Sequence, residues 1–201
     1  MIEVEKSFLL DEKTEKRLMG GAEFISKEII KDIYYDNDNH DITTKDRWLR
    51  KRDGKWELKI PAVKQEPVSK RVLDRYEEIT SEDRIQEVLK LEANGALDEN
   101  LEANGFFPIV AITTTRSKYK KSDFIIDIDE VDFDPNYRVG EIELIVEDES
   151  QIEAASKKIL EFVKASGLNL NYLPLRGGKV QEYLRRNNPK LYADLIEAGV
   201  V

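Results

Sequence analysis

Cysteine is absent from this 201-residue sequence, and histidine occurs once, at His40. The lack of cysteine excludes disulfides, thiolate nucleophiles and cysteine-ligated zinc, and it is typical of a reducing compartment. No run of about 20 apolar residues is present, so we expect no membrane-spanning segment. The first residues carry acidic side chains where a secretion signal would need basic ones followed by an apolar stretch. We therefore expect a cytoplasmic protein without membrane association.

Positive charge is also scarce, since 32 Lys and Arg residues face 41 Asp and Glu residues, for a net charge of -9. This balance argues against general nucleic-acid binding, which needs a basic surface. An anionic small-molecule substrate would instead need a local basic pocket. No linker-like or low-complexity stretch divides the chain, so we expect one domain over residues 1–201, acting as a monomer.

Two acidic pairs are the first chemical signal, Glu3 with Glu5 and Glu141 with Glu143. Residues two apart on a strand point to the same face of a sheet. Carboxylates that meet on one face repel each other, and a cation or a basic partner would neutralise them. The pairs therefore predict a metal site with oxygen ligands.

A basic pocket is predicted by the segment 46–60. Read as a hairpin turning at Asp53 and Gly54, it sends Trp48, Arg50 and Arg52 to one face. In the second strand Glu57 and Lys59 share a face, with apolar side chains opposite. Two arginines two residues apart present planar donor forks, which suit the oxygens of a polyphosphate better than a single carboxylate.

The chain is rich in alternating apolar and polar residues, which predict eight strands and four helices. We expect strands at 2–9, 29–36, 46–53, 55–60, 71–79, 108–119, 123–130 and 139–147. Helices are expected at 80–91, with Thr80 and Asp83 as a capping box, at 149–165, at 179–186 and at 190–198. The pentapeptide Leu-Glu-Ala-Asn-Gly occurs at 91–95 and again at 101–105, and we interpret both copies as turns around Leu97.

The charged faces of these strands must either be exposed to water or line the inside of the fold. An open antiparallel sheet with its polar face in water is one possibility. The other is an α+β fold in which an eight-stranded antiparallel barrel, closed or nearly closed, holds opposed acidic and basic side chains in a wet lumen, with helices packed outside. The sorting of acidic and basic residues onto different strands favours the barrel.

Seven short motifs, in order along nearly the whole chain, resemble the CYTH superfamily, the triphosphate tunnel metalloenzymes. They begin at Glu3, Tyr34, Trp48, Trp56, Thr115, Asp127 and Val139. The context of Trp48 and the tail from Lys179 to Leu184 are most similar to animal-type thiamine triphosphatases. The resemblance implies Mg²⁺-dependent hydrolysis of thiamine triphosphate to thiamine diphosphate and phosphate, by in-line attack of water in a tunnel. The helices at about 179–198 are then expected to cover the tunnel mouth.

The resemblance also implies a set of site residues. The metal, Mg²⁺ or else Mn²⁺, would be bound by Glu3, Glu5, Asp127, Glu141 and Glu143. The triphosphate would be bound by Arg50, Arg52, Lys59, Arg116 and Lys179, and Trp48 would stack on the organic head group. Lys59, Tyr34 and Glu143 are the expected catalytic residues, although Tyr34 has the alternative of an ordinary strand tyrosine, and Trp48 that of plugging the barrel end.

One position departs from the family pattern. The opening motif of the family is Glu-x-Glu-x-Lys, and here Ser7 occupies the last place. Lys6 is adjacent, but the strand period points it away from Glu3 and Glu5. The same site with inorganic tripolyphosphate as substrate, or a polyphosphate-binding module without catalysis, are therefore kept as alternatives.

Overall fold

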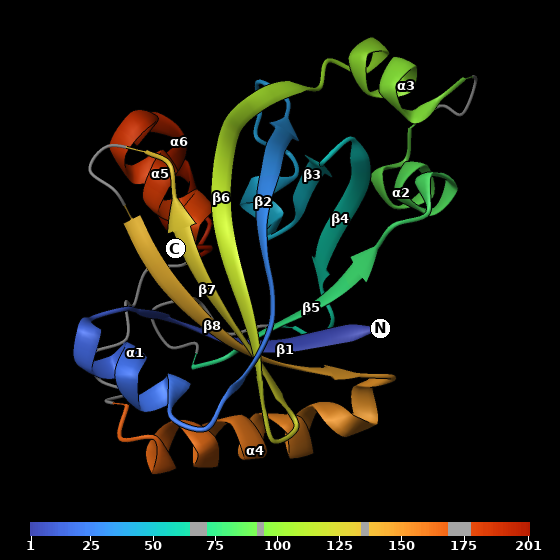
Figure 1. Cartoon of the computed structure of the whole chain (residues 1–201). Coiled ribbons are helices and arrows are strands. Elements are labelled where there is room, and N and C mark those ends of the chain that lie inside the picture. Colours follow the sequence, from blue (N-terminus) through green and yellow to red (C-terminus); the bar gives the residue numbers. More distant parts are fainter. Residues whose placement is uncertain (65–71, 92–94, 134–136, 169–177) are drawn as a thin grey trace.

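The computed structural model describes residues 1–64, 72–91, 95–133, 137–168 and 178–201. Its centre is a closed antiparallel barrel with the strand order β1-β5-β4-β3-β2-β6-β7-β8 (Figure 1). The predicted eight-stranded barrel is therefore confirmed. The strands are β1 (Ile2–Leu9), β2 (Glu23–Asp36), β3 (Trp48–Arg52), β4 (Lys55–Pro61), β5 (Asp74–Ile79), β6 (Phe107–Lys121), β7 (Phe124–Val131) and β8 (Tyr137–Val146). The α-helices are α1 (Glu12–Met19), α2 (Glu82–Leu89), α3 (Leu97–Ala103), α4 (Ile152–Ala165), α5 (Lys179–Asn187) and α6 (Pro189–Glu197).

The observed elements differ from the sequence prediction by a few residues at several ends, and most clearly in four places. Strand β2 begins six residues earlier than expected, at Glu23, because it pairs with β6 along nearly its whole length. Helix α2 is capped by Ser81, whose hydroxyl accepts from the Arg84 amide, and not by Thr80. Helix α1 was not predicted, and the stretch around Leu97, interpreted as turn, forms helix α3.

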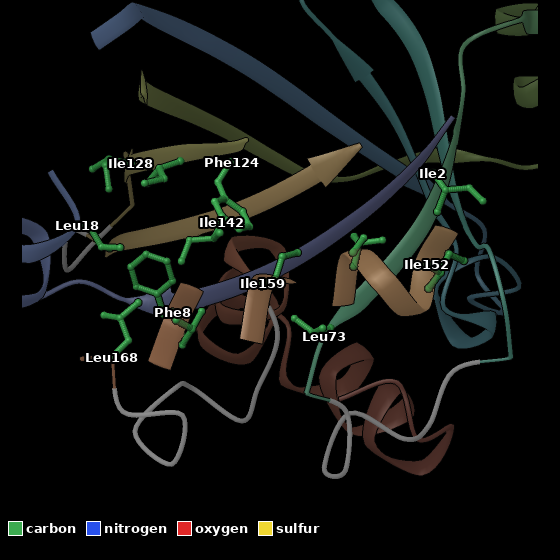
Figure 2. Packing of buried hydrophobic residues seen from close by; sticks show 14 residues of the cluster. Ile2, Phe8, Leu18, Leu73, Phe124, Ile128, Ile142, Ile152, Ile159 and Leu168 are labelled. Atoms are coloured by element: carbon green, nitrogen blue, oxygen red, sulfur yellow. The ribbon is translucent and has the colours of Figure 1, made fainter. Parts of the chain in front are cut away.

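Helix α4 covers the outer face of β1, β7 and β8. Alternate residues of these strands point outward, among them Phe8, Ile126 and Ile142, which are fully buried. Figure 2 shows Phe8 and Ile142 near Ile159 of α4, and Ile2 of β1 near Ile152 of the same helix. This apolar contact turns the other face of the same strands, with its carboxylates, toward the barrel interior.

Helices α2 and α3 cover the outer face of β3, β4 and β5. Leu49, Trp56 and Leu58 point outward and pack with Ile85 and Leu97, all of them buried. The same alternation points Arg50, Glu57 and Lys59 inward. The two-residue period assigned to the hairpin is thereby confirmed.

Helices α5 and α6 pack against side chains at one end of the barrel interior. Val180 and Leu184 of α5 belong to one buried cluster with Tyr34, Trp48 and Tyr76. Figure 1 places α5 and α6 side by side next to β6 and β7. The residue that begins α5, Lys179, thereby enters the interior. None of the helices in the described ranges is both long and apolar enough to cross a membrane.

Gly140 allows β8 to approach β1 beneath an aromatic ring. It is paired in register with Phe8, and a Cβ atom at this position would lie 2.3 Å from the Phe8 Cζ. Phe8 is fully buried, so its ring has no free volume into which to move. We expect Gly140→Ala to lower the free energy of unfolding by about 1–3 kcal/mol, which urea denaturation would measure. Gly54→Ala is a comparison without such a clash, since nothing lies within 4 Å of its Cβ position, although its φ of +84° adds backbone strain.

Candidate active site

The barrel interior collects the charged side chains from all eight strands. The strand register brings Glu5 opposite Glu143, Asp127 opposite Lys118 and Arg50 opposite Glu57. Facing residues of paired strands share one side of the wall, so each of these pairs points into the same lumen. All the predicted metal-binding and phosphate-binding residues lie on this inner face or, for Lys179, at the end of α5 against it.

Three of the predicted metal ligands form one cluster. Carboxylate oxygens of Glu3, Glu5 and Glu143 lie within 4.8 Å of one another. Burial, a hydrogen bond with Glu3 and the charges of Glu3 and Asp127 raise the pKa of Glu143 to about 9. Burial also raises the pKa of Glu5 well above its ordinary value. The three carboxylates therefore repel one another strongly, as predicted for a cation site.

Lys59 is the cation nearest to this cluster. Its ammonium donates to Glu3, lies 3.5 Å from Glu5 and lies 3.9 Å from Glu78. Burial acts to lower the pKa of Lys59, but the charges of Glu3 and Glu5 outweigh it and raise the pKa. At neutral pH the lysine is thus a fixed positive charge beside the acidic cluster.

The other two predicted metal ligands, Asp127 and Glu141, lie around Arg116 instead. The Arg116 guanidinium is 2.5 Å from Asp127 and 2.9 Å from Glu141, and it makes two hydrogen bonds of 2.7 Å to Asp129. Lys179 donates to the same Asp129, over 2.7 Å. Asp129 thus orients two of the predicted phosphate-binding cations and is held between them.

Asp127 is the least satisfied carboxylate of this group. It is fully buried, and neither of its oxygens accepts a hydrogen bond from the residues that the structure describes, because the close Arg116 nitrogen is poorly aligned. Burial raises its pKa to about 6, although the charges of Arg116 and Lys118 act in the opposite direction. A buried acceptor without a donor costs stability unless something else satisfies it.

The two hairpin arginines have internal counter-ions. Arg50 donates to Glu57 over 2.8 Å and to Glu78 over 3.0 Å. Arg52 makes two hydrogen bonds to Asp32, of 2.7 and 3.0 Å. The role expected for Glu57 from the sequence is a counter-ion of Arg50 or Arg52, and its placement beside Arg50 agrees with that role.

An aromatic corner lies beyond Lys59. Asp46 accepts hydrogen bonds from the Tyr76 hydroxyl, over 2.6 Å, and from the Trp48 indole, over 3.3 Å. The Lys59 ammonium lies 5.8 Å from the centre of the Tyr76 ring. Lys59, one of the predicted phosphate-binding residues, therefore lies next to a group of two aromatic rings and a carboxylate.

Tyr34 contacts Arg50 in the barrel interior. Its hydroxyl accepts from Arg50 over 3.4 Å, while the ammonium of Lys59 is directed to Glu3 and Glu5. Tyr34 is thus placed to orient an arginine.

Among the described residues, the charged side chains of the interior that sequence reasoning missed include Asp32, Asp46, Glu78 and Lys118. Asp32 precedes Tyr34 by two positions and Lys118 follows Arg116 by two, so the strand period could have found both. His40 contacts Asp194 of α6 over 2.9 Å and takes no part in the site.

The donor set fits a small hard divalent cation. Every candidate ligand is a carboxylate, which suits Mg²⁺ or Mn²⁺. The oxygens of Glu3, Glu5 and Glu143 lie within 4.8 Å of one another, so these three glutamates are the residues that would hold such an ion. The unsatisfied oxygens of Asp127 offer a further acceptor nearby.

Comparisons with known proteins agree with this geometry. The family model for the CYTH domain matches residues 1–171. Human thiamine triphosphatase is 31% identical over 219 aligned positions, which cover 99% of this chain and 91% of the relative, and the enzyme of Macaca fascicularis gives the same values. A solved structure from Pyrococcus horikoshii superposes with a TM-score of 0.57 at 25% identity, covering 83% of this chain and 91% of the other. The chain belongs to the CYTH domain family.

Proposed function

We propose that this protein hydrolyses thiamine triphosphate to thiamine diphosphate and phosphate, with Mg²⁺ as cofactor. The chain is a hydrolase that acts on triphosphates, since it belongs to the CYTH family and is similar to thiamine triphosphatases over nearly its whole length. One observation carries the proposal. Inside one closed barrel, the acidic cluster of Glu3, Glu5 and Glu143 lies beside a row of positively charged side chains.

Different cations of the interior would bind different parts of a triphosphate. Arg50 and Arg52 present guanidinium groups that can bind phosphate oxygens in pairs, and Arg116 adds a third guanidinium from β6, two strands around the barrel wall. Lys59 is placed at the edge of the acidic cluster, where the terminal phosphoryl group would come closest to a cation. Their internal carboxylate partners keep these side chains oriented before a substrate arrives, so little reorganisation is needed on binding.

Hydrolysis then needs only an aligned water and stabilised charge. A Mg²⁺ ion held by Glu3, Glu5 and Glu143 would neutralise charge on the phosphoryl oxygens. Lys59, Arg50 and Arg116 stabilise the charge that develops on the equatorial oxygens and the leaving diphosphate, while Tyr34 positions Arg50. No covalent nucleophile is required. Lys179 and helix α5 close the end of the lumen against water in this proposal.

The aromatic corner favours an organic cationic head group over bare tripolyphosphate. Trp48 and Tyr76 are two buried aromatic rings, and Asp46, which accepts a hydrogen bond from each, adds negative charge beside them. A positively charged thiazolium gains from both. Inorganic tripolyphosphate could use the same cations but would leave this corner unused, and this makes it the second candidate substrate.

The proposal is tested by phosphate release from thiamine triphosphate, tripolyphosphate and ATP, each with and without Mg²⁺. We expect Mg²⁺-dependent release, with the highest kcat/KM for thiamine triphosphate. Higher kcat/KM on tripolyphosphate would move the assignment to the second candidate. Binding of tripolyphosphate without any release, at excess Mg²⁺, would indicate a module without catalysis.

Trp48→Ala separates the two substrates. Loss of the indole removes a cation–π contact of about 0.5–2 kcal/mol, so we expect the KM for thiamine triphosphate to rise about 2-fold to 30-fold. The KM for tripolyphosphate should stay within twofold of its original value. Steady-state kinetics on both substrates provides the check, and Trp48→Phe, which keeps a ring, is the matched control. Equal changes on both substrates would remove the thiamine assignment.

A further inference from the structure

The position of Ser7 defines a gap in the row of phosphate-binding cations. Ser7 points into the lumen opposite Glu141, whereas Lys6 lies on the outward side of β1, between the buried Val4 and Phe8. Lys6 therefore does not supply the charge that the family motif places at position 7. Any substitute has to come from another strand.

The strand register leads around the wall to one candidate. Ser7 is paired with Glu141, Glu141 with Asp127, and Asp127 with Lys118. These residues form one row on the inner face of β1, β8, β7 and β6. The Lys118 ammonium leans from this row toward the acidic cluster, since it lies 3.8 Å from Glu143, the residue that pairs with Glu5 of β1.

Lys118 is also less engaged with protein groups than the other five described cations of the site. Arg50, Arg52, Lys59, Arg116 and Lys179 each donate a hydrogen bond of 3.0 Å or less to a carboxylate. Lys118 approaches Asp127 and Glu143 only to 3.6 and 3.8 Å, and within the described residues it has no hydrogen-bonded partner. Its side chain is 29% exposed, against 6–20% for the other five.

We propose that Lys118 supplies the phosphate-binding charge that position 7 lacks in this chain. An ammonium beyond hydrogen-bond distance of its neighbours, and open to the lumen, can turn to a phosphate oxygen without breaking a protein hydrogen bond. Its place beside Glu143 puts that charge next to the acidic cluster, where the terminal phosphoryl group is expected. The inference rests on the proposed triphosphate site and adds a specific residue to it.

The test removes the positive charge at position 118 on β6 and introduces one at position 7 on β1. We expect Lys118→Ala to weaken tripolyphosphate binding, measured by calorimetry, by about 10-fold to 100-fold, and to raise the KM for thiamine triphosphate by a similar factor. Adding Ser7→Lys to Lys118→Ala should restore binding to within about threefold. Lys118→Arg, which keeps the charge, should stay close to the original protein. Lys27→Ala is the matched control, because Lys27 is an exposed lysine on the neighbouring β2.

The possible results separate this inference from the proposed function. If Lys118→Ala binds tripolyphosphate as tightly as Lys27→Ala, or if Ser7→Lys in a folded double variant restores nothing, the role of Lys118 is refuted. A melting curve of each variant establishes that it is folded, and Ser7→Arg replaces Ser7→Lys where that variant does not fold. Absence of phosphate release from the original protein would instead overturn the proposed function, while the binding measurements would still decide the role of Lys118.

Discussion

Glu143→Gln is expected to lower Mg²⁺-dependent turnover by about 100-fold or more and, in the same protein, to raise the free energy of unfolding without metal. The loss of turnover follows from removing one of the three carboxylates that the proposed cation site requires. The gain in stability follows from removing the repulsion among Glu3, Glu5 and Glu143, which the metal-free protein has to tolerate. A substitution that affects function and stability in opposite directions is typical of a binding site that is strained when empty.

The stability gain should depend on pH in a defined direction. Burial and the neighbouring carboxylates raise the pKa of Glu143 from an ordinary value of 4.5 to about 9. An acid with a raised pKa binds its proton more tightly in the folded protein, so its contribution to stability is fully present below about pH 4.5 and is lost as the pH rises to about 9. At pH 7 this cost reaches at most about 3 kcal/mol, and the lowered pKa of Glu3 offsets part of it.

Urea denaturation between pH 5 and pH 9 measures this effect, with and without Mg²⁺. The difference between Glu143→Gln and the original protein should grow from pH 5 to pH 9. Mg²⁺ should stabilise the original protein more than the variant, because the variant has lost a ligand. Glu147→Gln, at an exposed position just after β8, is the control and should match the original protein. Retained Mg²⁺-dependent turnover in Glu143→Gln would contradict the ligand assignment.

The inner faces of the strands could be predicted from the sequence because a strand has a strict period of two. That period alone is enough to place Arg50, Arg52 and Lys59 on the lumen side. It could not predict which carboxylates meet, because this depends on the stagger of the strands when the barrel closes. The stagger pairs Glu5 with Glu143 but Glu141 with Ser7, so Glu143 joins the acidic cluster while Glu141 is left beside Arg116.

The sequence prediction missed helices α1 and α3 for different reasons. Helix α1 carries local signals that could have been used, since Asp11 caps it, acidic residues fill its first turn and basic residues its last. Helix α3 has no side-chain cap, and its Asn104 and Gly105 are typical turn residues. Its position depends on tertiary contacts, in which Leu97 and Leu101 are buried against β3 and β4, and Asp98 accepts from Lys51 and Trp56. A short helix held by distant strands leaves little trace in local sequence.

Arg116→Met should be the most destabilising of the lumen substitutions. Its guanidinium is the common partner of Asp127, Asp129 and Glu141, and both aspartates are fully buried. Methionine fills a similar length of side chain but leaves these carboxylates without their shared cation. Removing one partner of a buried ion pair costs about 3–5 kcal/mol, because the remaining charge stays desolvated.

Lys179 keeps one of the three carboxylates, Asp129, paired with a cation in the Arg116→Met variant. It donates to Asp129 over 2.7 Å and keeps that charge paired in the variant, whereas among the described cations Asp127 retains only Lys118, at 3.6 Å. The loss should therefore centre on Asp127, and a second change, Asp127→Asn, should recover part of the stability in the Arg116→Met background. Guanidinium titrations of the single and double variants measure this coupling. Arg185→Met is the control, because Arg185 pairs with Glu182 at an exposed position and should cost less than about 1 kcal/mol. Equal losses at Arg116 and Arg185 would show that the lumen charges are well hydrated and that the buried network does not stabilise the fold.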